Sequence, residues 1–435
     1  MRTVPIPETF GLVPSGSDLV LYLLFVPFAA ALIIRLRRCL PDIRLRRLAT
    51  LAPGSAGAII RIAHHVLLQW RVAQHPRGWP HLAIFFGFLG LLAATSLVAV
   101  DWTLARISGT HFLSGAFYLR FESLVDAFSL LFVAGLLIAL IRRLVNLRRT
   151  EPAQRRIQRL FILNIAGLLY LGLTGFLLEG LRLVIHPVPW AGWSFVGVRL
   201  AHALGAFGVG PSAQPFYVVL WWSHALVAFL LISLLPYGPL LHAVAAPLNI
   251  MMTQDKPHLE PRVPFDLRSV LASGDFDLKV GLSSIGDLQG AERCALLACT
   301  SCGRCEAVCP AVAIGTALSP RKLVQTLREQ ILVKTPLKDL LATSVVSAAE
   351  VWACTTCAAC VMVCPVLIHP VDYIIPFRRE LVSRQLLEKR HLELLDALHR
   401  CANPYGLPTA SRNRLAADLE PMHILKHQEQ QQCVK

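Results

Sequence analysis

Eight of the twelve cysteines lie in two short runs of the same spacing. The run Cys-x2-Cys-x2-Cys-x3-Cys-Pro covers residues 299–310 and is repeated over residues 354–365. Gaps of two residues let three sulfur atoms converge from one loop, and a fourth thiolate arrives from elsewhere to complete a cubane cluster. The doubled run therefore predicts two [4Fe-4S] clusters. The alternative is zinc, which favours paired CxxC units and leaves the four-cysteine runs unexplained.

The fourth cysteine of each run is expected to serve the cluster of the other run, as in the bacterial two-cluster pattern. The predicted ligands are Cys299, Cys302, Cys305 and Cys364 for cluster 1, and Cys354, Cys357, Cys360 and Cys309 for cluster 2. Shared ligation brings the two clusters close together, so this segment would carry single electrons between two stations. No catalytic residue is predicted.

Histidines in apolar stretches are the second set of residues that could bind a redox group, because polar groups inside a bilayer are costly and usually functional. His224 and His242 are eighteen residues apart, which is five turns of a straight helix. Two haem levels would fit this spacing. His81 is expected to share an inner haem b with His242, and His202 an outer haem b with His224. The prolines at 236 and 239 could kink the helix and spoil this geometry.

The histidine assignments have alternatives. His186 and His111 could replace His202 as the second outer ligand. For His224 the alternative is a quinone contact or a simple hydrogen bond. Without haem, the inner pair would be solvated at the membrane interface.

The elements that must position these residues follow from the composition. Hydrophobic residues make up 55% of the 435 and charged residues 16%, against about 45–50% and 25% in soluble proteins, which excludes a simple water-soluble globule. A helix needs about 20 apolar residues to cross a bilayer. Five such windows predict transmembrane helices at about 18–35, 80–100, 123–142, 160–182 and 215–243. Residues 56–70 mix apolar with basic side chains and predict an interfacial helix.

The arginines predict the orientation. Six of them follow the first apolar helix and seven follow the third, whereas the alternate loops 101–122 and 182–215 hold two each. By the positive-inside rule the N-terminus lies outside, and everything after about residue 245 lies in the cytoplasm. The protein is therefore expected to be a multi-pass protein of the cell inner membrane. The net charge of +15 comes mostly from arginines in the predicted cytoplasmic loops, and no nucleic-acid partner is expected.

The predicted fold is all-α, a five-helix transmembrane bundle followed by a cytoplasmic helical ferredoxin domain. Ser319-Pro320 and Thr335-Pro336 each offer an N-cap followed by proline in the first turn of a helix between the two cysteine runs. The predicted boundaries are 1–250 for the membrane domain, 251–290 for a linker, 291–382 for the ferredoxin domain and 383–435 for a helical or extended tail.

The apolar half resembles known membrane cytochromes. Five helices, with His224 and His242 in the fifth, make residues 18–250 similar to the gamma subunit of respiratory nitrate reductases and to the cytochrome b subunit of membrane-bound heterodisulfide reductase. In the nitrate reductase family the second helix carries two haem ligands; His81 matches one, and Leu91 stands where the other would be. The resemblance implies haem b, with one haem expected and two as the alternative, and a quinone site near the bilayer.

The cysteine-rich half resembles a helical ferredoxin. The segments LACTSCGRCEAVCP and WACTTCAACVMVCP are similar to the ferredoxin of heterodisulfide reductase and related membrane iron-sulfur oxidoreductases. In several such relatives, including those proposed to link electron-transfer flavoprotein to quinone, the chain continues into cysteine-rich CCG domains. Residues 403–406 resemble the connecting segment, but no CCG run follows. The resemblance therefore implies a CCG-domain or flavoprotein partner on a separate subunit.

These features together predict a membrane electron-transfer subunit of a quinone-linked oxidoreductase. It would pass electrons between a cytoplasmic partner, the two clusters, haem b and the quinone pool. The rival hypothesis is a haem-free membrane anchor that docks the ferredoxin domain and its partner. An iron-sulfur redox sensor is disfavoured because nothing resembles a DNA-binding or signalling module.

Overall fold

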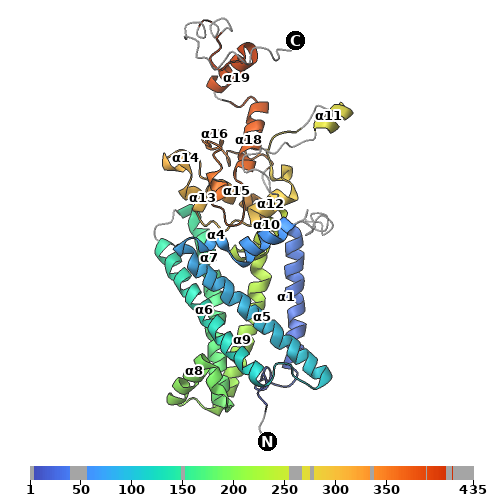
Figure 1. Cartoon of the computed structure of the whole chain (residues 1–435), viewed down its shortest axis with the longest axis vertical. Coiled ribbons are helices and arrows are strands. Elements are labelled where there is room, and N and C mark those ends of the chain that lie inside the picture. Colours follow the sequence, from blue (N-terminus) through green and yellow to red (C-terminus); the bar gives the residue numbers. More distant parts are fainter. Residues whose placement is uncertain are drawn as a thin grey trace.

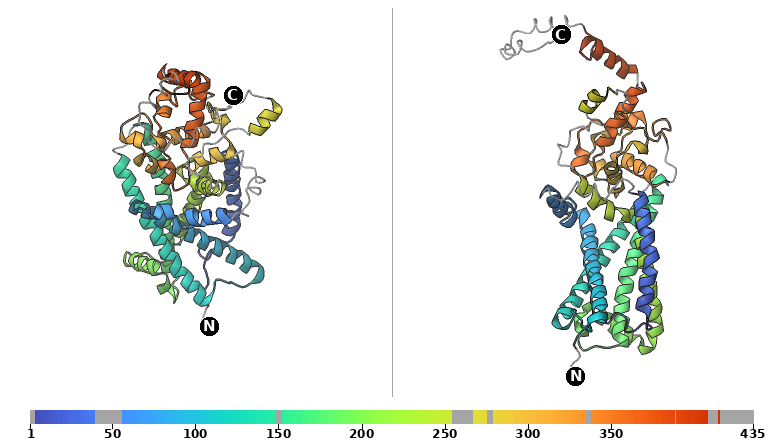
Figure 2. Two further views of the ribbon diagram at one scale, coloured as in Figure 1. Left: turned by 45° about the horizontal axis from the view of Figure 1, so that its top comes forward. Right: turned by 90° about the vertical axis from the view of Figure 1, so that its right-hand side faces the viewer.

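A computed structural model of the chain describes residues 4–39, 56–147, 152–253, 267–274, 279–333, 338–387, 389–407 and 414. Every regular element in these residues is helical, as predicted for an all-α fold. Figure 1 shows a bundle of long helices with a second helical domain stacked on one end. The side view in Figure 2 shows both parts along one axis, with the N-terminal residues at the far end of the bundle.

Five helices of the described residues are long and apolar enough to cross a membrane, which confirms the predicted bundle. Their surface is apolar, and in the most hydrophobic window of the first helix no residue is buried inside the protein. Large apolar surfaces of this kind are stable in lipid rather than in water. The five helices are α1 (Ser17–Cys39), α5 (Trp79–Ser108), α6 (Gly115–Leu147), α7 (Pro152–Ile185) and α9 (Gln214–Leu234).

The bundle helices pack in the order α5, α6, α7, α9, α1. Close approach of α5 and α6 depends on glycine, since small residues let helix backbones come together in a membrane. A β-carbon on Gly87 of α5 would lie 2.7 Å from the backbone nitrogen of Phe132 on α6. At the far end of the bundle, α8 (Phe195–Ala206) packs against α7, flanked by the short turns η3 (Ala191–Trp193) and η4 (Pro211–Ala213).

We expect a Gly87→Ala variant to be less stable than the unmodified protein. The obstructing atoms belong to the backbone of α6, and overpacking of this kind costs about 1–3 kcal/mol. The matched control is Gly205→Ala on α8, where a β-carbon meets no atom within 4 Å. Alanine favours a helix over glycine by roughly 1 kcal/mol, so the control should be neutral or stabilising. Thermal unfolding in detergent measures both; equal melting temperatures for the two variants would contradict the prediction.

The fifth apolar helix is shorter than predicted, and its residues 235–243 are not part of it. The helix α9 ends at Leu234, two 3₁₀ turns follow as η5 (Leu235–Tyr237) and η6 (Pro239–Leu241), and the chain then enters α10 (His242–Met252). Pro236 and Pro239 break the helix because proline cannot donate the backbone hydrogen bonds that would continue it. His224 and His242 therefore do not share one straight helix, and the same-face argument for them is wrong.

A junction separates the bundle from the second domain, and α10 lies in it (Figure 1). Residues 56–78 lie beside α10 as α3 (Ala56–Arg61), the π-helix η1 (Ile62–Leu67), α4 (Trp70–Ala73) and η2 (Pro76–Gly78), and both α3 and η1 pack against it. Ile60 and Trp70 are exposed. The segment predicted as an interfacial helix is thus a broken helix outside the five candidate spans.

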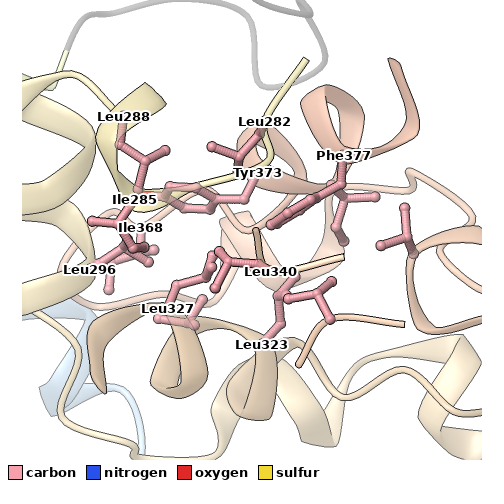
Figure 3. Close-up of a cluster of buried hydrophobic side chains, with 14 of the residues drawn as sticks. Leu282, Ile285, Leu288, Leu296, Leu323, Leu327, Leu340, Ile368, Tyr373 and Phe377 are labelled. Carbon is pink, nitrogen blue, oxygen red and sulfur yellow. The ribbon is translucent and has the colours of Figure 1, made fainter. Parts of the chain in front are cut away.

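The second domain has a core of leucine, isoleucine and aromatic side chains, shown in Figure 3. Leu241, Ala245 and Ala246 at the junction belong to the same buried cluster, as do Leu282 and Ile285. The core therefore extends beyond the predicted domain boundary at residue 291. Its helices are α12 (Gly290–Leu297), α13 (Arg304–Ala307), α14 (Pro310–Ala313), α15 (Pro320–Leu332), α16 (Ala348–Trp352), α17 (Ala359–Met362) and α18 (Val371–Ser383).

The predicted start of α15 is present in detail. The Ser319 hydroxyl accepts a hydrogen bond from the backbone nitrogen of Lys322 at 3.1 Å, and Pro320 occupies the first turn. The second predicted cap, Thr335-Pro336, lies outside the described residues. The predicted linker includes α11 (Leu267–Ser273) and η7 (Ile285–Asp287), and the predicted tail begins with α19 (Lys389–Cys401), which extends from the end of the domain away from the bundle (Figure 1).

Candidate metal centres

One complete predicted ligand set lines a single cavity in the second domain. Cys299 and Cys302 line this cavity from the loop after α12, and Cys305 lines it from α13. Cys364, which follows α17, lines the same cavity although it belongs to the second cysteine run. The structure therefore brings together the four side chains predicted to bind cluster 1.

The other predicted set lines a second cavity. Cys354, Cys357 and Cys360 line it together with Cys309, which comes from the first run. Cys360 lines both cavities. The exchange of the fourth cysteine between runs is possible because α13 and α17 pack against each other. In the described part of the chain, no three His, Cys, Asp or Glu side chains converge as they would on a single metal ion.

The two cysteine loops have the same backbone conformation. Ser301 and Thr356, each two residues after the first cysteine of its run, have φ values of 56° and 54°. Gly303 and Ala358, each four residues after it, have φ values of 80° and 56°. Left-handed conformations cost roughly 1–2 kcal/mol for residues other than glycine. Three strained residues at matching places indicate that both loops are shaped to present sulfur atoms and not for stability alone.

The thiols of these loops need positive charge nearby to ionise. Burial, with the neighbouring cysteines, raises the pKa of Cys360 to about 12. Burial raises the pKa of Cys364 to about 12 as well, although two backbone amides donate hydrogen bonds to it. A metal centre supplies such a charge, because thiolates bound to a cation are deprotonated outright. The donor set therefore fits an iron-sulfur cluster.

The predicted inner haem ligands lie side by side. His81 is in the first turn of α5 and His242 begins α10, and their ring centroids are 6.3 Å apart with an angle of 49° between the ring planes. An imidazole nitrogen lies about 2 Å from a metal that it binds, so one iron between two imidazoles sets the ring centroids about 6 Å apart. The two imidazoles are therefore close enough that they would be able to hold one haem iron between them.

The predicted outer pair is not brought together. His202 is exposed on α8, and no ring contact joins it to His224. The Nδ1 atom of His224 lies 2.8 Å from the Thr174 hydroxyl, which itself donates to the Tyr170 carbonyl at 2.7 Å.

The two alternative outer ligands have acidic partners. The Nδ1 atom of His186 lies 2.9 Å from a carboxylate oxygen of Glu8. The Nδ1 atom of His111 lies 2.6 Å from a carboxylate oxygen of Asp101.

Contacts across the junction were not foreseen from the sequence, and they involve the loops of cluster 1. An Arg71 guanidinium nitrogen donates to the Cys364 carbonyl at 2.7 Å, and Arg304 donates to the Arg71 carbonyl at 2.6 Å. Asn249 of α10 donates to the Val366 carbonyl at 2.7 Å. Arg304 is also close enough to His81 to interact electrostatically with it. The cavity of cluster 1 is therefore next to the histidine pair.

These features define an iron-sulfur protein in which a ferredoxin domain sits on a helical bundle of the membrane type. A family model described as a 4Fe-4S dicluster domain matches residues 298–368, which include all eight cysteines of the two runs. The chain therefore contains a 4Fe-4S dicluster domain and is related to membrane iron-sulfur oxidoreductases.

Three relatives illustrate the relationship. "EtfAB:quinone oxidoreductase" of Syntrophomonas wolfei is 27% identical over 79% of this chain and 52% of its own length. "Probable membrane-anchored ferredoxin" of Chromohalobacter salexigens is 30% identical over 50% of this chain and 37% of its own. A subunit of the ferredoxin:CoB-CoM heterodisulfide reductase of Methanosarcina mazei is 26% identical over 31% of this chain and 78% of its own. The chain thus spans about half the length of the first of these. No solved structure gives a significant match.

Proposed function

We propose that this chain is a membrane electron-transfer subunit that connects a soluble redox partner with the quinone pool through two [4Fe-4S] clusters and haem b. The observation that carries the proposal is the arrangement at the junction. Two cavities, each lined by a complete cysteine set, lie in the second domain, and the Arg304 loop of one of them is next to His81. Cysteine side chains that could bind clusters are thus followed, toward the bundle, by histidine side chains that could bind haem.

The chain supplies ligation, spacing and shielding, while the redox chemistry belongs to the cofactors. The eight cysteines provide the thiolates, and His81 and His242 provide the imidazoles. Haem b, when bound, supplies a one-electron carrier at the edge of the apolar bundle. The apolar core around the cysteine loops limits the access of water, and the contacts of Arg71 and Asn249 hold the loop after Cys364 against the junction.

The soluble partner is proposed to be a CCG-domain protein or an electron-transfer flavoprotein. The name of the Syntrophomonas wolfei relative supports the flavoprotein, and that of the Methanosarcina mazei relative supports a heterodisulfide-reductase-like complex. Among the three relatives, the proposed exchange of electrons with quinone is supported by the name of the Syntrophomonas wolfei protein alone.

We propose that the protein lies in the cell inner membrane, with the ferredoxin domain in the cytoplasm. Basic side chains support this orientation, since they are concentrated at the junction end of the bundle. Arg142 donates to the carbonyl of Arg77 beside α5, and Arg35 of α1 donates to the Ser233 carbonyl near the end of α9. Such residues favour the cytoplasmic side of a membrane.

Spectra and metal analysis of the native protein in detergent test this function. We expect about eight iron atoms in cubane form, four per cluster, and a b-type band in the dithionite-reduced minus oxidised spectrum. Haem measured at one per chain supports ligation by His81 and His242 alone, whereas two per chain would require a second ligand pair, because the structure does not bring His224 and His202 together. Intact clusters without a b-type band would instead favour the haem-free anchor.

A further inference from the structure

The surroundings of the two cavities differ in charge. Arg304 and Arg321 line the cavity of cluster 1, whereas no charged side chain is among the described residues that line the cavity of cluster 2. Arg321 forms an ion pair with Glu306 at 2.7 Å, so its charge is offset. Arg304 lies between two ligands in the sequence and donates to a backbone carbonyl. No carboxylate in the described part of the chain forms an ion pair with Arg304, so its positive charge is not offset there.

Arg71 adds a second cation to cluster 1. Its guanidinium binds the carbonyl of Cys364 itself, and it comes from α4 in the junction and not from the ferredoxin domain. Cluster 2 has one comparable cation, Arg378, which donates to the Cys354 carbonyl and lies over the Trp352 ring at 5.0 Å. Among the described residues, Arg71 and Arg304 thus lie near cluster 1 without an acidic partner, Arg328 also interacts electrostatically with Cys299, and Arg378 lies near cluster 2.

Hydrogen bonds to sulfur differ in the same direction. In cluster 1 the backbone nitrogens of Ser301 and Ile368 donate to the sulfur atoms of Cys299 and Cys364 at 3.5 and 3.2 Å. In cluster 2 the corresponding bond runs from Thr356 to the sulfur of Cys354 at 3.3 Å. Access of water does not separate the two sites, because each has one exposed cysteine, Cys302 or Cys357.

Reduction adds negative charge to a cluster, so nearby cations and N–H donors to sulfur raise its reduction potential. We propose that Arg71 and Arg304 hold cluster 1 at a higher potential than cluster 2, so that electrons move from cluster 2 to cluster 1 and toward the junction. In this step cluster 2 loses one electron and cluster 1 gains it; no bond forms or breaks and no proton moves. The proposal rests on the two clusters of the proposed function, and Arg71 and Arg304 are positioning residues within it.

A redox titration of the full-length protein, followed by electron paramagnetic resonance, tests the proposal. The unmodified protein should show two reduction waves. Arg71→Gln should shift the higher wave downward by about 59 mV, which for one electron lowers the ratio of reduced to oxidised cluster about tenfold at a given potential. Arg304→Gln should shift the same wave, and Arg71→Lys should restore most of the difference because it keeps the charge.

Arg378→Gln is the matched control, because its guanidinium contacts a ligand carbonyl of the other cluster. It should move the lower wave. The proposal is overturned if the two waves coincide, if Arg71→Gln moves the lower wave, or if neither Arg71→Gln nor Arg304→Gln moves the higher one. Failure of the proposed function has a different signature, namely absence of cubane iron or of its paramagnetic signals from the unmodified protein.

Discussion

A Cys364→Ala variant should lose cluster 1 and keep cluster 2. Cys364 lies in the second cysteine run, but its side chain lines the cavity of the first three cysteines and its backbone is held by Arg71. Removing a thiolate leaves three ligands for a centre that needs four. Iron should fall from about eight toward about four atoms per chain, and the signal of the higher-potential cluster should disappear or change to that of a three-iron remnant.

Two control variants distinguish crossed ligation from ligation of each cluster by its own cysteine run. Cys305→Ala belongs to the same cavity, so its spectrum should match that of Cys364→Ala. Cys309→Ala removes a side chain that lines only the other cavity, so it should affect the lower-potential cluster. If Cys364→Ala matched Cys354→Ala instead, each run would bind its own cluster, and the crossed assignment would be wrong.

A His242→Ala variant should lose haem b and retain both clusters. Its ring lies 6.3 Å from that of His81, so the two imidazoles would be able to hold one haem iron between them. Loss of one axial ligand should lower haem content by more than about tenfold, since even changes to the groups that orient a ligand cost about 10- to 100-fold in metal affinity. Quinone-linked turnover should fall with the haem, while the iron of the clusters stays unchanged.

His81→Ala should give the same result, and His75→Ala is the matched control. His75 lies just before η2 at the same junction, and its side chain is exposed. The b-type band of the control should equal that of the unmodified protein. Full quinone reduction by His242→Ala protein would contradict the haem relay and support the anchor.

The parts that could be predicted from the sequence are those whose signal is local. Cysteines spaced by two residues must share a loop, and apolar windows of membrane length must be helices, so both are apparent without a structure. The interrupted fifth helix was harder, because Pro236 and Pro239 compete with an apolar pattern that continues past them. The pairing of His81 with His242 does not depend on the straight helix expected to join His224 and His242, so it is unaffected by the absence of that helix.

Arg71 could not have been found from the sequence. It is one basic residue among several in an interfacial segment, and its partner Cys364 is 293 residues away. No spacing or periodicity marks such a pair, since the contact exists only where segments far apart in the sequence pack against each other. The same holds for Asn249, whose amide contacts a carbonyl 117 residues further along. Sequence patterns identify the ligands, but the side chains that contact the ligand loops, such as Arg71 and Asn249, are brought there by tertiary packing.

The proline break after α9 also limits how this protein can be rebuilt. Because the chain turns there, Leu241, Ala245 and Ala246 leave the bundle and become part of the buried cluster with Leu296 and Leu297. A chimera with a foreign ferredoxin joined after residue 253 would lack the side chains that pack against α10. A fragment starting at residue 279 would expose the face of α12 that α10 covers. A fragment meant to fold as the second domain must therefore include residues 235–253. Its first residue lies inside the segment 215–243, which hydropathy alone assigns to the fifth transmembrane helix.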